Sequence, residues 1–199
     1  MKKISYNKAP FRTFSSSLFR SVIASSSATP IVYGPYELLA ESEVTGSAVT
    51  SIDFTGLTLD SDDELILVSD IVNDSGSTSA YSLYVNNDTT ATNYYVQSLY
   101  STSTTNTAAR TNNSVYATVE TSDKLLAETI LKLTASSYFI YQSNIVRRYG
   151  ASDVSLQDIY CTKTATISSI TQLTVSASVA SSIGIGSKFW LFKVGDDVV

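Results

Sequence analysis

The sequence predicts an all-β protein, an antiparallel β-sandwich of jelly-roll-like type that follows an extended basic N-terminal arm. Apolar and polar residues alternate with a period of two in many segments after Tyr36. These segments are rich in β-branched and aromatic residues and are separated by clusters of Gly, Asn, Asp and Ser. No long helical segment lies between them, which favours an antiparallel sandwich over βαβ units.

Charge divides the chain into two parts. Residues 1–36 contain five basic residues and no acidic one, whereas the rest has eight basic residues against all 18 acids, a net charge of −10. The change falls at the segment TPIVYGPY, whose Pro and Gly residues indicate a turn or linker. We therefore divide the chain into an arm, residues 1–35, and a β-sandwich domain, residues 36–199.

The arm combines basic and apolar residues. Its apolar residues recur at helical spacing between Phe14 and Ala24, which predicts a short amphipathic helix over 14–24. So short a helix needs packing to persist, so we expect it to dock onto a neighbour or back onto the sandwich domain. The residues expected to bind a partner are Lys2, Lys3, Lys8, Phe11, Arg12, Phe14, Leu18, Phe19 and Arg20.

The first residues bear on targeting. MKKISYNKAPFRTF has the charged opening of a signal peptide but no apolar region after it, so we do not expect secretion by that route. An organelle transit peptide is the alternative, because the segment contains Arg, Ser and Phe and no acid. No run approaches the roughly 18 apolar residues of a membrane helix, so no membrane association is expected.

About eleven strands are expected in the sandwich domain. Those that the pattern delimits lie near residues 51–55, 64–72, 81–85, 93–100, 114–121, 126–134, 137–147, 156–164, 169–177 and 188–194. The segment 123–134 also has a helical face through Leu125, Leu126, Thr129 and Leu133. Its Thr content and the flanking strands favour a strand.

Two polar segments are expected to be loops that project from the sandwich, residues 86–93 and residues 101–113. Such loops commonly carry recognition. The residues in and beside them that would form a glycan-binding site are Asn87, Asp88, Tyr94, Tyr95, Tyr100 and Arg110. Tyrosines also fill sandwich cores and subunit contacts, and that interpretation is the more frequent one.

No catalytic residue, metal site or cofactor is predicted. The chain has no histidine, which removes the commonest general base and the commonest zinc ligand. Its single cysteine, Cys161, excludes an intrachain disulfide and a multi-cysteine metal site. We expect Cys161 to be a small buried core residue in a chain made in a reducing compartment. A polysaccharide-degrading enzyme remains an alternative, but nothing singles out a carboxylate pair.

Three further motifs have structural and functional interpretations. The acids Asp60, Asp62, Asp63 and Glu64 could ligate Ca²⁺, but a solvated turn before a strand is the favoured interpretation. The run GIGS at 184–187 is too short for a phosphate-binding loop and predicts a turn. Arg147-Arg148-Tyr149 could bind a phosphate or a sugar acid, or pair with acids of the same or a neighbouring subunit. The net charge of −10 disfavours nucleic-acid binding by the domain.

Several segments, taken in order, resemble a group of virion proteins of tailed bacteriophages. They are YELLAESEVTGSAVTSIDFTGL (36–57), DELILVSDIV (63–72), SLYVNNDTTATNYYVQSLY (82–100) and SITQLTVSASVASSIGIGSKFWLFKV (169–194). Gly186, Ser187, Phe189 and Leu191 match the group's closing strand, while Phe192 stands where Tyr is usual and Lys193 where Gly is usual. The resemblance covers residues 36–194 and leaves the arm without a counterpart.

The resemblance implies a non-enzymatic virion structural protein with a jelly-roll-like domain, oligomeric and commonly trimeric, that is made in the host cytoplasm. The basic arm favours a capsid decoration protein, since such an arm can order on an acidic surface such as that of the major capsid protein. Multivalent attachment would turn weak single contacts into firm occupancy. The alternative is a tail- or fibre-associated module that binds a receptor or host surface glycans.

Overall fold

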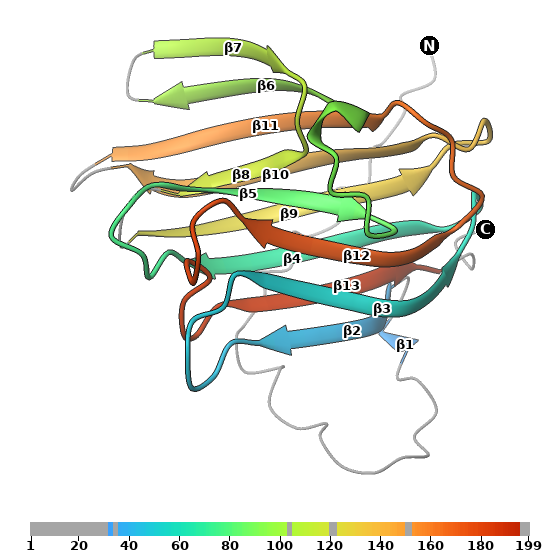
Figure 1. The fold of residues 1–199 in the computed structure, drawn as a ribbon, viewed down its shortest axis with the longest axis horizontal. Helices are drawn as coiled ribbons and strands as arrows, with labels where there is room; N and C mark the ends of the chain where they lie inside the picture. Colours follow the sequence, from blue (N-terminus) through green and yellow to red (C-terminus); the bar gives the residue numbers. More distant parts are fainter. Residues whose placement is uncertain (1–31, 34–35, 103–104, 120–122, 150–152, 196–199) are drawn as a thin grey trace, which may run out of the picture.

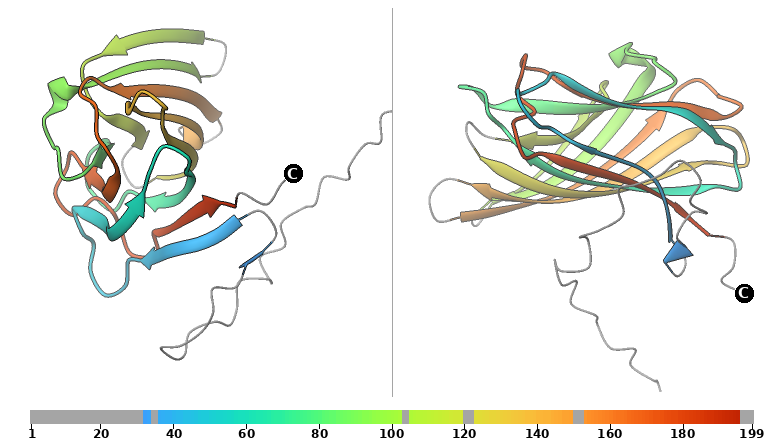
Figure 2. Two further views of the ribbon diagram at one scale, coloured as in Figure 1. Left: turned by 90° about the vertical axis from the view of Figure 1, so that its right-hand side faces the viewer. Right: turned by 90° about the horizontal axis from the view of Figure 1, so that it is seen from below.

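The computed structural model describes residues 32–33, 36–102, 105–119, 123–149 and 153–195, and these form two antiparallel β-sheets packed face to face (Figures 1 and 2). The strands are β1 (Val32–Tyr33), β2 (Tyr36–Glu43), β3 (Ser51–Leu59), β4 (Glu64–Val72), β5 (Ser79–Val85), β6 (Tyr94–Thr102), β7 (Thr105–Thr111), β8 (Val115–Val119), β9 (Lys124–Leu133), β10 (Phe139–Tyr149), β11 (Asp153–Lys163), β12 (Ile170–Ala177) and β13 (Lys188–Val194). The 3₁₀ turn η2 (Ala91–Asn93) precedes β6. The predicted antiparallel sandwich is confirmed.

The strand order is that of a jelly roll with added strands. The large sheet has the order β1-β2-β13-β4-β9-β10-β11-β6-β7, and the small sheet has the order β3-β12-β5-β8. Two facing four-stranded sheets, β2-β13-β4-β9 and β3-β12-β5-β8, form the eight-stranded jelly roll. The strands β6 and β7 are inserted between β5 and β8, and β10 and β11 between β9 and β12. Both insertions extend the large sheet beyond β9, at the edge opposite β1 and β2 (Figure 1).

The core lies between the sheets and follows the period of two. Along β4 the inward residues Leu65, Leu67, Ser69 and Ile71 are fully buried. Most buried polar side-chain atoms have a hydrogen-bond partner, because an unpaired buried polar atom is destabilising. The hydroxyl of Tyr116, for example, donates to Ser69 Oγ at 3.3 Å. This packing makes the sandwich a rigid support for the residues on its outer faces.

The predicted strands after Tyr36 are confirmed, including the segment 126–134, which forms most of β9 rather than a helix. The predicted loop over residues 101–113 is wrong, because Thr105–Thr111 forms β7 and pairs with β6 from Val96↔Thr111 to Thr102↔Thr105. The segment TNTAART contains no large apolar residue. It forms an edge strand through main-chain hydrogen bonds and therefore shows no hydrophobic alternation.

The segment 86–93 is a tight connection rather than a free loop. Asn86 and Asn87 have positive φ values of 53° and 61°, as the central residues of a type I′ turn require, and Asp88 N donates to the Val85 carbonyl at 3.1 Å to close it. The Asn86 side chain ties this turn to β12, because its Nδ2 donates to Ser169 O at 2.7 Å and its Oδ1 accepts from Thr171 N at 2.8 Å.

The predicted division at residue 35 falls beside a short hairpin, in which Val32 pairs with Glu37 and Tyr33 with Tyr36. The expected helix over 14–24 and the arm residues Lys2, Lys3, Lys8, Phe11, Arg12, Phe14, Leu18, Phe19 and Arg20 lie outside the described residues.

Candidate functional site

The outer face of the large sheet carries most of the exposed apolar side chains. Among the described residues, all the exposed large apolar side chains except Tyr138 and Ile185 lie on this face. The strand registers place them there, because they fall at the positions that alternate with the buried residues. They are Tyr36, Leu38, Tyr95, Leu99, Leu126, Ile140, Val146, Val154, Leu156 and Tyr160. All but Tyr36, Leu38 and Leu126 belong to the inserted strands β6, β10 and β11.

Five of these residues form what we call the apolar patch: Leu99, Leu126, Val146, Val154 and Leu156. Val146 pairs with Leu126 on one side and with Leu156 on the other, so three apolar side chains stand in a row across β9, β10 and β11. The side chains of Leu126, Val146 and Leu156 are 53%, 51% and 54% exposed, respectively. Such a contiguous apolar surface on a soluble protein usually marks an interaction site.

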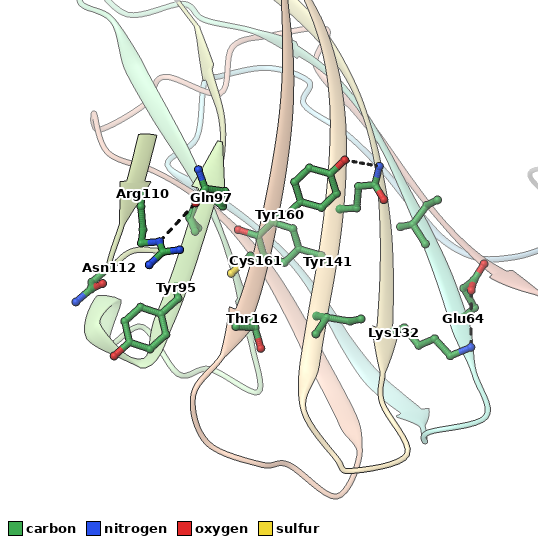
Figure 3. A pocket seen from close by; sticks show the side chains of 14 residues that line it. Glu64, Tyr95, Gln97, Arg110, Asn112, Lys132, Tyr141, Tyr160, Cys161 and Thr162 are labelled. Atoms are coloured by element: carbon green, nitrogen blue, oxygen red, sulfur yellow. Dashed lines mark hydrogen bonds and ion pairs between the residues drawn. The ribbon is translucent and has the colours of Figure 1, made fainter. Parts of the chain in front are cut away.

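The opposite end of the same face is hollowed into an open groove of about 750 Å³ (Figure 3). Side chains from β4, β9, β10, β11, β6 and β7 contribute to it. Tyr95 and Tyr160 are 49% and 45% exposed there. The side chains that line the groove from the outer face are Glu64, Tyr95, Gln97, Arg110, Asn112, Ile130, Lys132, Ile140, Gln142, Tyr160 and Thr162.

Weak polar contacts link the groove side chains to one another. Arg110 Nε donates to Gln97 Oε1 at 3.4 Å, and Gln97 Nε2 donates to the Ala109 carbonyl at 3.2 Å. Gln142 Nε2 donates to the Tyr160 hydroxyl at 3.4 Å. Figure 3 marks the contact between Arg110 and Gln97 and the hydrogen bond to the Tyr160 hydroxyl on the sheet surface, with the 3.9 Å ion pair between Lys132 and Glu64 at the far side.

Two of the six residues predicted for glycan binding come together in the groove, and four do not. Tyr95 and Arg110 line it. Tyr94 is fully buried, and its hydroxyl accepts from Val85 N and donates to the Asp88 carbonyl. Asn87 belongs to the β5–β6 turn, and Tyr100 shares the inward parity of Tyr94 and Val96 on β6. Asp88 forms an ion pair away from the groove.

The partner of Asp88 is Lys163, whose Nζ lies 2.7 Å from Asp88 Oδ2. The Lys163 side chain is only 5% exposed and lies over the Tyr94 ring, 5.7 Å from its centroid. Burial alone would raise the pKa of the Asp88 carboxyl group. Hydrogen bonds from Lys163, from Asn93 Nδ2 and from Thr90 N outweigh burial and lower this pKa to about 2. The ion pair therefore joins the end of β11 to the β5–β6 connection.

The acidic cluster forms a turn, as expected. Asp60 N donates to Asp63 Oδ2 at 3.1 Å and Asp62 N donates to Asp60 Oδ1 at 3.0 Å. Asp63 forms an ion pair with Lys193, and Glu64 pairs with Lys132. Within the part of the chain that the structure describes, no group of three or more Cys, Asp or Glu residues could hold a metal ion.

Arg147 and Cys161 both face the interior. Arg147 is 6% exposed and its Nη1 donates to the Thr118 carbonyl at 2.9 Å, so it binds the facing strand β8 rather than a surface ligand. Cys161 is buried, as predicted. Burial raises the pKa of its thiol to about 12, although a hydrogen bond with Tyr141 acts in the opposite direction. The thiol is therefore protonated and poorly reactive at neutral pH.

Sequence reasoning missed the outward residues of β9, β10 and β11. The sequence did contain a signal for them. The runs LAETILKL and YFIYQSNIVR have apolar residues at odd-numbered and at even-numbered positions, so that both faces of each strand carry apolar side chains. Strands that are apolar on both faces are typically covered on both faces.

No helix within the described ranges is long and apolar enough to cross a membrane. Comparison of the chain with protein-family models, with curated proteins and with solved structures finds no significant match.

Proposed function

We propose that this chain is a non-enzymatic virion structural protein, a capsid decoration protein that associates with copies of itself through the apolar patch. The observation that carries the proposal is the concentration of exposed apolar side chains on the outer face of the inserted strands. The resemblance of residues 36–194 to tailed-phage virion proteins supports the same role.

The position of the patch favours an intermolecular role. The eight-stranded jelly roll already encloses a core, and β10 and β11 add a face that turns away from that core. Burying apolar surface stabilises by about 25 cal/mol per Å², so leaving Leu126, Val146 and Leu156 in water forgoes stability unless another molecule covers them.

A second copy of the chain fits this face by its charge. Four charged residues lie beside the patch: Lys124 and Glu128 on β9, Asp158 on β11, and Asp70 on β4, which pairs with Leu126. Because charges of both signs lie beside the patch, contact between two copies of this surface does not bring together charges of one sign only. A homo-oligomer, commonly a trimer in the virion proteins that the chain resembles, is therefore the proposed assembly.

The basic arm supplies a second attachment in this proposal. Its charge of +5 is opposite to that of the sandwich domain, so it is attracted to acidic protein surfaces such as that of a major capsid protein. Several arms on one oligomer would bind together, and effective concentration would strengthen weak individual contacts.

Virions made by the genome that encodes the chain test the role directly. Mass spectrometry and electron microscopy of purified particles are expected to find the protein on the capsid surface, in a fixed ratio to the major capsid protein. A full-length variant with Lys2, Lys3, Lys8, Arg12 and Arg20 changed to Gln is expected to fold. It is expected to bind particles from which this protein has been removed more weakly than the unchanged protein does. The control, Lys188→Gln on β13 of the sandwich domain, lies outside the apolar patch and is expected to bind normally. Absence of the chain from the particles would refute the proposal.

A further inference from the structure

We propose that the groove on the outer face of the large sheet binds an oligosaccharide, with an acidic sugar placed beside Arg110. This inference goes beyond the assembly role and does not depend on it. It places the binding site on the sheet face rather than on the loops in which the sequence suggested one. Its basis is a row of side chains that crosses five neighbouring strands, Ile130, Gln142, Tyr160, Gln97 and Arg110.

The aromatic residues supply stacking surfaces. Tyr95 pairs with Thr162 and Tyr160 pairs with Gln97, so the two tyrosines are diagonal neighbours on β6 and β11. Their side chains are 49% and 45% exposed. An exposed tyrosine presents an apolar ring face together with a hydroxyl at its edge. That combination suits a sugar ring, which has C–H groups on its faces and hydroxyls around its rim.

The amides supply matching hydrogen-bond groups. Tyr160 lies between Gln142 on β10 and Gln97 on β6 in the strand register, and Asn112 lies near Tyr95 at the end of the row (Figure 3). A primary amide both donates and accepts, as does a sugar hydroxyl. The existing contacts of Gln97 and Gln142, 3.2–3.4 Å long, hold these amides in the groove and are weak enough to be exchanged for ligand contacts.

Charge in the groove distinguishes its two ends. At the β4–β9 end Glu64 and Lys132 pair with each other at 3.9 Å. At the β7 end Arg110 contacts the neutral Gln97 and stands exposed. The guanidinium group binds carboxylates through two parallel hydrogen bonds, which a lysine does not do. The expected ligand therefore carries a carboxylated sugar, such as a sialic or uronic acid, at the Arg110 end.

The groove is separate from the apolar patch. On β9, β10 and β11 a polar row formed by Glu128, Asn144 and Asp158 lies between the groove and the patch residues Leu126, Val146 and Leu156. On β6 the same row ends at Leu99, which belongs to the patch and lies two positions from Gln97. Self-association at the patch and glycan binding in the groove can therefore be lost independently.

The test uses the full-length protein on a printed array of neutral, sialylated and uronate-containing glycans, followed by titration calorimetry with the best soluble oligosaccharide. The protein is expected to bind acidic glycans. Tyr95→Ala and Tyr160→Ala are each expected to weaken binding at least tenfold, and Arg110→Gln to remove the preference for acidic over neutral glycans. The matched control is Tyr138→Ala, since Tyr138 is 42% exposed but does not line the groove.

The proposal would be overturned if no glycan on the array is bound, if binding persists in both groove tyrosine variants, or if Tyr138→Ala weakens binding equally. If the groove variants instead change the molar mass of the protein in solution, the groove is a protein interface and the glycan assignment is wrong. An apolar-patch variant such as Leu156→Glu is expected to bind glycan normally, which separates this test from that of the assembly role.

Discussion

Lys163 Nζ and Asp88 Oδ2 lie 2.7 Å apart and join two segments that are separated in the chain by strands β6 to β11. The lysine is almost fully enclosed, whereas the carboxylate is 23% exposed. The two charged groups therefore differ in how well water can solvate them when the partner is removed. The carboxylate can be rehydrated, but the ammonium group cannot.

This asymmetry predicts unequal effects of two substitutions. Asp88→Asn leaves a buried ammonium group without its counterion and is expected to destabilise the fold by about 3 kcal/mol. Lys163→Met leaves a carboxylate that water and Asn93 still solvate, and is expected to cost about 1–2 kcal/mol. Urea unfolding of both variants and of the double variant measures the difference. Equal losses would contradict the proposed asymmetry.

The same ion pair predicts acid sensitivity. The pKa of Asp88 is lowered from 3.8 to about 2, so its contribution is present above pH 4 and is lost as the pH falls from about 4 to about 2. The expected loss of unfolding free energy is about 2 kcal/mol, because protonated Asp88 leaves the Lys163 ammonium group unpaired as Asp88→Asn does, while solvent partly screens the exposed carboxylate. Urea unfolding as a function of pH measures it. The slope between pH 4 and pH 2 is expected to be smaller in Asp88→Asn, and an unchanged slope would assign the acid sensitivity to other groups.

The buried thiol of Cys161 is expected to be unreactive in the native protein. Its pKa is raised to about 12 and its side chain is enclosed, so little thiolate is available to react. Ellman's reagent at pH 8 is expected to label less than a tenth of the protein in an hour, and all of it in denaturant. Rapid labelling of the folded protein would show that β11 opens locally.

Gly184, in the turn before β13, is expected to tolerate no side chain. A Cβ atom there would lie 2.5 Å from Asp74 Cβ and 3.0 Å from the Val72 carbonyl oxygen, so the backbone would have to move. Gly184→Ala is expected to cost about 1–3 kcal/mol in thermal or urea unfolding. Gly76→Ala is the control, since nothing lies within 4 Å of its added Cβ, and it is expected to be neutral within about 0.5 kcal/mol.

The strands could be predicted from local pattern, because burial of one face imposes a period of two. The run ELILVSDIV forms β4 with the expected bounds Glu64–Val72, and 188–194 forms β13. The edge strand β7 could not be predicted, because it buries no large side chain and is held by main-chain hydrogen bonds to β6.

The site could be predicted only in part, because face and neighbours depend on long-range pairing. Tyr94 and Tyr95 are adjacent in the sequence, yet one is fully buried and the other is 49% exposed. Local sequence does not say which parity faces the core. The row that joins Gln142, Tyr160 and Gln97 depends on pairing between β10, β11 and β6, which the sequence pattern does not specify.

The central claim is that the apolar patch on the inserted strands is a contact between copies of the chain, and molar mass in solution tests it most directly. Light scattering during size-exclusion chromatography is expected to give a multiple of the 21.4 kDa monomer at micromolar concentration. Val146→Glu/Leu156→Glu is expected to give the monomer, with Val146→Thr/Leu156→Thr as a second variant that keeps strand propensity. Ile185→Glu, at an equally exposed apolar residue off the sheet face, is expected to remain an oligomer. A wild-type protein that elutes at 21.4 kDa, or an oligomer unaffected by both patch variants, would contradict the account.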